Sequence, residues 1–236
     1  MSDGQSNQLA NMPDQAIQVI TAPAAFFRDM PQTGGYVDPA VFLVVMGVVA
    51  ALIQIVLGFI GLGEFGMMAA AATGFLAIFV LPLFMIIGGF IMAAIGFVVW
   101  RFLGSQRDFE TAFRCVAYSS AIAPVVAIIG TVPYAGTIAH VAWGMFLVYL
   151  ASIEVHGIKA QTAKILFGVI GAIMALMSVM SEHTARQFQE QAEIMQEQFQ
   201  GTLQGMENKT PEEMGEALGE FLKGLEKASK QTQDQN

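Results

Sequence analysis

Few side chains in this chain of 236 residues have the chemistry of catalysis or metal binding. His140, His156 and His183 are far apart in the sequence, and Cys115 is the one cysteine, so the chain has no internal disulfide and no Cys-rich metal site. Glu154 and His156 are two positions apart, which on a helix places them on diverging sides. No nucleophile–base constellation can be assembled. We therefore expect no enzyme activity, no cofactor and no metal.

One glycine-rich segment has the spelling of a nucleotide-binding loop. Residues 61–66, GLGEFG, match the glycine spacing of a dinucleotide fingerprint. That fingerprint requires a preceding strand inside a βαβ unit, whereas an apolar segment of helical length precedes it here. We interpret the segment as a tight turn between two helices.

The composition indicates which elements position these residues. Hydrophobic residues make up 55% of the chain and charged residues 13%, against about 25% charged in soluble domains. A helix needs about 20 apolar residues to cross a bilayer. The sequence predicts an all-α polytopic membrane protein, a bundle of five transmembrane helices with an amphipathic helical C-terminal tail. The expected spans are Val41–Leu62, Leu81–Trp100, Phe113–Val132, Thr137–Val155 and Thr162–Met180. The expected domains are 1–38, 39–181 and 182–236.

The second span is ambiguous, because residues 67–100 carry no charge and would extend about 50 Å as one helix. Either 67–80 is a re-entrant or interfacial segment that leads into one crossing, or two crossings meet around Pro82. Two crossings would place the later cations on the side opposite to Arg28. One crossing places all of them on the same side, so we expect five spans.

The distribution of cations predicts the orientation. Lys and Arg occur before the first span, between the second and third spans, and between the fourth and fifth spans. They are absent from 62–66 and 130–137, which is the positive-inside pattern. We expect a cytoplasmic N-terminus, an external tail and a bacterial cytoplasmic membrane. The tail is acidic, with 11 acidic and 5 basic residues from Glu182 onward. No basic patch exists, so nucleic acid is not an expected partner. The cations before the tail are Arg28, Arg101, Arg107, Arg114, Lys159 and Lys164.

The first 36 residues do not have the pattern of a signal peptide. Thr21-Ala22-Pro23 can start a short helix with proline in its first turn. Phe26, Phe27 and Met30 would then share one face, which favours an interfacial helix. A disordered lead-in is the alternative.

Polar residues inside the spans are costly in lipid and therefore informative. Gln54 is alone in the first span, and Tyr118, Ser119, Ser120 and Pro124 mark a kink in the third. These residues serve either helix packing or a route for a substrate through the bundle. In the loop after the fourth span, Glu154, His156 and Lys159 are candidates for recognition. The alternative is an ordinary solvated helix end whose lysines meet anionic headgroups.

The tail contains an apolar stripe at helical spacing, formed by Phe188, Ala192, Met195, Phe199, Leu203 and Met206. Thr210-Pro211-Glu212-Glu213 predicts the start of a second helix. The stripes can dock onto each other, onto a partner or onto the membrane surface, or remain as helices dispersed in solution.

Several short motifs follow one another between residues 21 and 180: Ala22-Pro23-Ala24-Ala25-Phe26-Phe27, Phe113-Arg114, Ala117-Tyr118-Ser119-Ser120, Pro124, Val132-Pro133-Tyr134-Ala135-Gly136, Trp143 and Ile153-Glu154-Val155-His156-Gly157-Ile158-Lys159. Their order and spacing resemble the membrane domain of the Yip family, named for interaction with Ypt/Rab-type GTPases, and the lead-in is similar to that of prokaryotic members. The resemblance adds Pro133 and Gly136 to the candidate interaction or structural residues. It implies a five-span helical domain with a cytoplasmic N-terminus and, for eukaryotic relatives, a small GTPase partner.

Together these features predict a non-enzymatic membrane protein that organises membranes or binds a membrane or peripheral protein partner. A homo-oligomer is also compatible with the small residues in its spans. The alternative is a small-solute transporter or channel subunit, suggested by Gln54 and the kinked third span.

Overall fold

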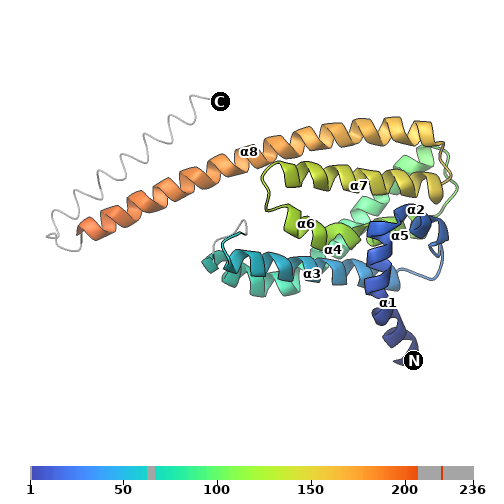
Figure 1. Ribbon diagram of the computed structural model, residues 1–236, viewed down its shortest axis with the longest axis horizontal. Helices are drawn as coiled ribbons and strands as arrows, with labels where there is room; N and C mark the ends of the chain where they lie inside the picture. The colour runs from blue at the N-terminus through green and yellow to red at the C-terminus, as the bar shows by residue number, and fades with distance from the viewer. Residues whose placement is uncertain (1, 63–66, 207–218, 220–236) are drawn as a thin grey trace. The chain divides into compact units, whose positions relative to one another are not determined.

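The computed structural model describes residues 2–62, 67–206 and 219 and forms helices (Figure 1). The chain divides into two compact units, Met1–Val179 and Met180–Asn236. The elements in chain order are α1 (Ser2–Thr21), α2 (Pro23–Asp29), α3 (Val37–Phe59), α4 (Met67–Phe102), α5 (Phe109–Ser119), the 3₁₀ helix η1 (Ser120–Ile122), α6 (Ala123–Ile129), α7 (Ala135–Glu154) and α8 (Ala160–Met206).

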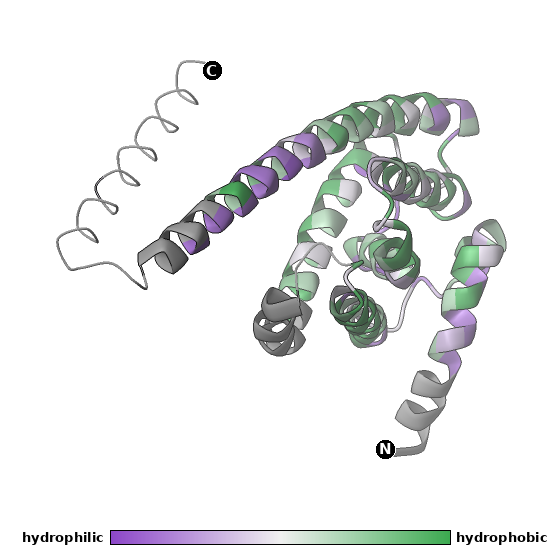
Figure 2. Ribbon diagram, turned by 60° about the vertical axis from the view of Figure 1, so that its left-hand side comes forward, coloured by the Kyte–Doolittle hydropathy of each residue, from purple (hydrophilic) through white to green (hydrophobic). Residues whose placement is uncertain are grey.

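Five helical segments in the described part of the chain are long and apolar enough to cross a membrane, which confirms the predicted fold class. Figure 2 shows long hydrophobic stretches in the bundle, while the later part of α8 is mostly hydrophilic. Helix α5, η1 and α6 together make the third segment. The five segments are Val37–Phe59, Leu83–Phe102, Phe109–Ile129, Ala135–Glu154 and Ala160–Glu197.

Helix α4 resolves the ambiguous stretch between the first and third spans. It runs without interruption from Met67 to Phe102, so two crossings around Pro82 do not form. Residues 67–80, expected to form a re-entrant or interfacial segment, continue into the second span as one helix that includes Pro82. The proposed turn at 61–66 lies outside the described residues from 63 onward, while Gly61 has a positive φ of 77° at the end of α3.

The core of the first unit lies where α3 packs against α4 and α6 and where α5 packs against α4. Its largest fully buried side chains include Phe27, Phe42, Trp100, Phe113 and Leu147. Phe90 and Phe113 stack with their ring centroids 4.3 Å apart. Aromatic contacts between helices thus fix the arrangement of α3, α4 and α5.

The N-terminal segment forms part of this core. Helix α2 begins at Pro23 as the sequence predicts, but Phe26, Phe27 and Met30 are buried inside the protein rather than spread on a membrane surface. Phe26 meets Tyr118 edge to face at 5.2 Å. The apolar face was identified correctly and its environment was not, because α1 and α7 pack against α2 and Tyr118 of α5 covers Phe26. The preceding residues form α1, so the disordered alternative is wrong for the described residues 2–21.

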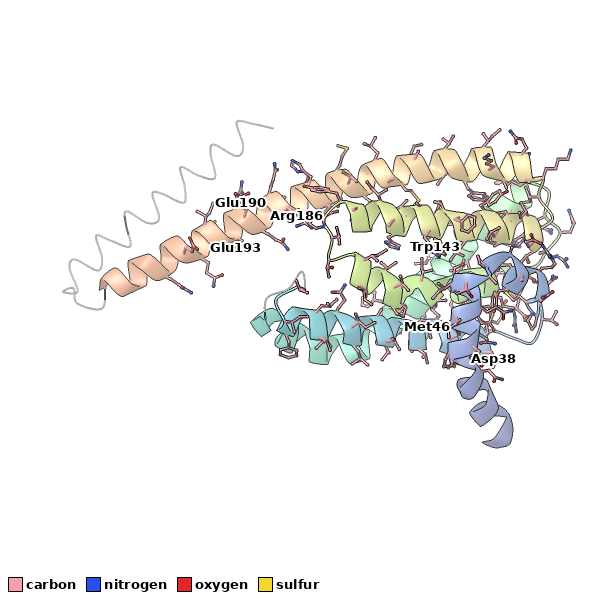
Figure 3. All side chains as sticks on the ribbon, in the orientation of Figure 1. Asp38, Met46, Trp143, Arg186, Glu190 and Glu193 are labelled. Atoms are coloured by element: carbon pink, nitrogen blue, oxygen red, sulfur yellow. The ribbon has the colours of Figure 1, made fainter. Side chains whose placement is uncertain are left out.

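The second unit begins within the polar half of α8 (Figure 2). The fifth span and the first tail helix, expected separately, are one helix, because no proline or glycine interrupts residues 172–200. Figure 3 labels Arg186, Glu190 and Glu193 on this half, where Arg186 pairs with Glu182 at 2.7 Å. Phe188 and Met195 of the predicted stripe are exposed. The side chains of 199, 203 and 206 and the predicted helix from Thr210 lie outside the described residues.

Candidate interaction site at the cationic end of the bundle

All cations ahead of the tail belong to helix ends or loops at the same end of the first unit. Helices α4 and α7 finish there, and α3, α5 and α8 begin there (Figure 1). We call this the cationic end. It contains Arg28, Arg101, Arg107, Arg114, Lys159 and Lys164.

His156 is the centre of a buried network at this end. Only 6% of the residue is exposed, although it lies in the loop after α7. Its ring stacks on Trp100 with centroids 3.9 Å apart and 17° between the planes. Its Nδ1 lies 2.8 Å from the hydroxyl oxygen of Ser105, and its Nε2 lies 3.9 Å from the Cys115 sulfur. One imidazole therefore joins α4, the loop after it, α5 and the end of α7.

Two further bonds tie the end of α7 to the same network. The indole N–H of Trp100 donates to the Ser152 hydroxyl at 2.8 Å. The Arg107 Nε donates to the main-chain carbonyl of Val155 at 3.0 Å. This carbonyl belongs to the residue just after α7, where helix ends leave acceptors without intrahelical partners. The loop that carries the predicted recognition residues is thus rigidly held.

The environment of His156 disfavours its charged form. Burial lowers the pKa of His156 to about 4, and the nearby Arg107 guanidinium adds to the effect. The imidazole is therefore neutral near pH 7. Its cysteine neighbour is 1% exposed, so substrate has no route to the thiol. The pair joins helices together and has no exposed nucleophile.

A second buried polar group lies at Arg114, which is 3% exposed. Its guanidinium donates to the Glu110 carboxylate at 3.2 Å and to the carbonyls of Pro31 and Gly35 at 3.3 and 2.9 Å. Glu110 also accepts the Gly35 N–H at 2.8 Å. This set fixes the connection between α2 and α3 onto α5. Because the charge is paired and hydrogen-bonded, its burial is tolerated.

The predicted recognition residues Glu154, His156 and Lys159 have three different environments. Glu154 accepts two bonds from Arg28, at 2.9 and 3.1 Å, and this hydrogen bonding raises the pKa of Arg28. His156 is buried as described, whereas Lys159 is exposed. The structure thus places one exposed cation and one exposed ion pair at the surface of this loop.

The residues of the predicted kink lie at the junction of α5 and α6. Ser119 donates to the carbonyl of Cys115 at 2.7 Å, and Ser120 donates to the carbonyl of Ala117 at 2.6 Å. Pro124 lies in the first turn of α6, as its missing N–H allows. Tyr118 packs edge to face on Phe42 at 5.1 Å. Both hydroxyls are thus bonded to main-chain carbonyls of their own segment.

Gln54 behaves in the same way, because its side-chain amide donates to the main-chain carbonyl of Ala127 in α6 at 3.2 Å. This bond joins α3 to the helix that follows the kink. The polar residue of the first span is therefore held by protein rather than facing an open channel.

Pro133 and Gly136 lie at the opposite end of the bundle, in the turn between α6 and α7. Tyr134 has φ 59° and ψ −47°, and the N–H of Ala135 donates to the Pro133 carbonyl at 2.6 Å, which is a γ-turn of the rare, strained hand. A Cβ atom on Gly136 would overlap the main-chain carbonyl of Ile129. Glycine is required there because α7 starts directly against α6.

Trp100, Ser105, Arg107, Cys115 and Ser152 were not predicted as site residues. They are separated in sequence by up to 52 positions, and nothing in their spacing signals that they meet. A tryptophan beside an arginine at the end of a span is the one available signal, since it is typical of a membrane interface. Within the described residues, no group of three or more His, Cys, Asp and Glu side chains is placed to hold a metal.

The comparison with protein families decides the identity of this domain. The model of the Yip1 domain matches residues 17–181, which is well over half of the chain. The chain belongs to the Yip1 family. No curated protein and no solved structure matches it. The Yip1 domain contains α2, all the helices of the cationic end and the apolar part of α8. Members of the Yip1 family are generally non-enzymatic membrane-trafficking proteins.

Proposed function

We propose that this Yip1-domain protein is a non-enzymatic component that organises a membrane or recruits a protein to it, and that the cationic end is its binding surface. The observation that carries the proposal is the contrast between buried and exposed charge at this end. Arg114 and His156 are locked inside the protein, whereas Arg28, Arg107 and Lys159 are exposed. A rigid frame that presents exposed cations is suited to binding an acidic surface.

The proposed orientation follows the positive-inside rule. The cationic end and the N-terminus would face the cytoplasm of a bacterial cell, and the acidic tail would lie outside. Single cysteines at Gln106 and Val132 test this orientation, on a Cys115→Ala background. A membrane-impermeant maleimide applied to intact cells should label the cysteine at 132 and not the one at 106. The reverse labelling would overturn the orientation.

The proposed partner is a peripheral membrane protein with an acidic surface, and the family resemblance makes a small GTPase the first one to test. A photo-crosslinking amino acid at Gln106 lies between Arg101 and Arg107, whereas the same group at Val132 lies at the opposite end and is also exposed. We expect a crosslinked adduct from 106 and none from 132.

Charge determines whether such an adduct is specific. Lys159→Glu should weaken the adduct formed from position 106, and added salt should weaken it further, because exposed charges are screened. Val132→Glu introduces the same acid at the other end and should leave the adduct unchanged. Equal adducts from both ends, or an adduct insensitive to Lys159→Glu, would contradict the proposal. An adduct with a second copy of the chain would instead indicate a homo-oligomer.

The transporter or channel alternative has its own experiment. Gln54, Ser119 and Ser120 all donate to main-chain carbonyls, so the described polar groups of the spans favour a packing role. Solute flux into liposomes that contain the protein, lost on Ser119→Val or Gln54→Leu, would support transport.

A further inference from the structure

A groove of about 560 Å³ runs along the membrane-spanning part of the bundle between α7 and α8. The two helices lie side by side in both ribbon views (Figure 1 and Figure 2). They leave the groove open because α8 presents small residues, while α7 presents larger ones. Its walls include Ile138, Met145, Phe146, Tyr149, Gly168 and Ala172.

The groove has one cationic mouth. Lys164 lines it near the start of α8, and Tyr149 lines it at a similar distance from the end of α7. Lys164 is exposed, and no hydrogen bond or ion pair to a protein group is recorded for it within the described residues. It lies near the start of α8, at the cationic end. The other end of the groove, at Ile138 and Ala175, is apolar.

The groove extends along most of the membrane-spanning length of α7 and α8. Lys164 and Ala175 are eleven positions apart in α8, which corresponds to about 16 Å at about 1.5 Å per residue. On α7 the lining runs from Tyr149 to Ile138, which is three positions from the start of that helix at the opposite end of the bundle. The groove thus begins beside a cation at the cationic end and continues between apolar walls past the middle of both spans.

We propose that this groove binds one acyl chain of an anionic phospholipid from the leaflet at the cationic end, with the lipid phosphate held by Lys164. The charge of the mouth complements an anionic headgroup, and the apolar wall complements the chain below it. A lysine near an anionic lipid surface provides a favourable electrostatic contribution to binding. The combination of one exposed lysine with a long apolar wall favours a lipid, which carries an anionic headgroup and an acyl chain in one molecule, over a purely apolar second helix.

The test uses the full chain purified from vesicles of phosphatidylcholine with about one third phosphatidylglycerol. Native mass spectrometry counts the lipids that remain bound. We expect one retained phosphatidylglycerol per chain and less retention from vesicles of phosphatidylcholine alone. Lys164→Gln should lower the preference for phosphatidylglycerol about fivefold, as expected from the loss of one lysine.

Filling the groove provides a second variant. A Cβ atom on Gly168 would meet no other atom within 4 Å, so Gly168→Leu can occupy the groove without displacing the helices. It should abolish retention of the lipid. Gly144→Leu is the matched control, because Gly144 of α7 also has open space around it and does not line the groove.

Phosphatidylglycerol with a photoreactive group in its acyl chain gives a readout that does not depend on these variants. We expect labelled peptides from α7 and α8 around Met145 and Gly168, well above labelling of the exposed face of α3 around Val56. Uniform labelling, or unchanged retention in Gly168→Leu, would overturn the proposal. A dimer that Gly168→Leu dissociates would overturn it too, by making a second copy the occupant.

Discussion

The third and fifth spans are both apolar enough to cross a membrane, yet their surroundings are opposite. Of the most apolar 18 consecutive residues in Phe109–Ile129, 44% are buried within the protein. The corresponding share in Ala160–Glu197 is 11%. The third span is broken at η1 and contains Arg114, Cys115 and two serines. The fifth is an unbroken helix. The comparison teaches that irregular backbone and polar side chains occur where protein covers them, because lipid cannot satisfy their hydrogen bonds.

The largest expected effect contrasts one side chain from each span. Phe113→Ala removes a fully buried ring stacked on Phe90 and should lower the free energy of unfolding by about 3–5 kcal/mol. Leu176→Ala in α8, where Leu176 is 63% exposed, should change it by less than about 0.5 kcal/mol. Unfolding in mixed micelles with increasing SDS measures both. Equal losses would contradict the contrast.

Acid should destabilise the network that anchors α5 to the end of α7. The pKa of His156 is about 4 in the folded protein and about 6.5 when unfolded. The unfolded chain therefore binds the extra proton between these pH values, and stability is complete above pH 6.5 and falls as the pH drops toward 4. The shift corresponds to roughly 3 kcal/mol.

Unfolding measured from pH 8 to pH 4.5 tests this dependence. His156→Gln should reduce stability at pH 8 but flatten the decline below pH 6.5. A decline that persists undiminished in His156→Gln would assign it to other groups.

A pair of glycines sharpens the comparison further. Gly136→Ala forces a methyl group against the carbonyl of Ile129 at the end of the third span and should cost about 2 kcal/mol. Gly168→Ala in the fifth span meets open space and should be neutral or stabilising by up to about 1 kcal/mol, from helix propensity. The same SDS titration measures them. A larger loss from Gly168→Ala would show that α8 is more closely covered than its exposure indicates.

The smallest effect is expected at the surface of the cationic end. Arg28 is 63% exposed at its side chain although it makes two bonds to Glu154. Arg28→Gln should leave the unfolding midpoint unchanged within error, because exposed ion pairs are weak and screened. A clear loss of stability would place this pair among the structural contacts between α2 and α7 rather than at a binding surface.

Local patterns determine where several helices begin. Asp108 followed by Thr111 begins α5, where the Thr111 N–H and hydroxyl both bond to the Asp108 carboxylate and lower the pKa of Asp108. Pro23 and Pro124 lie in the first turn of a helix, where the missing N–H leaves no hydrogen bond unmade. The apolar face of α2 was also identified from spacing. Its partner Tyr118 was not, because 92 positions separate it from Phe26.

The candidate site also combines features that local sequence indicates with contacts between distant segments that it does not. Three residues of one loop were predicted as candidates from the sequence, namely Glu154, His156 and Lys159. Nothing in the sequence indicated that His156 stacks on Trp100 or that Glu154 forms an ion pair with Arg28. Arg114 was predicted only as one more cation of the positive-inside pattern, and it is buried and paired. Charge shows on which side of a membrane a residue lies and not whether protein covers it.

The sequence by itself determined the helical class, the number of spans and the gathering of the cations at one end. These properties follow from the transfer of each residue between water and lipid, which depends on residue type and local spacing. The tertiary structure alone decided three things. Most of α5 is buried by other helices whereas most of α8 is exposed, His156 is neutral and buried, and α7 and α8 leave a groove between them. Those properties depend on which side chains from distant segments pack together. The spacing of residues along the sequence does not indicate which segments meet.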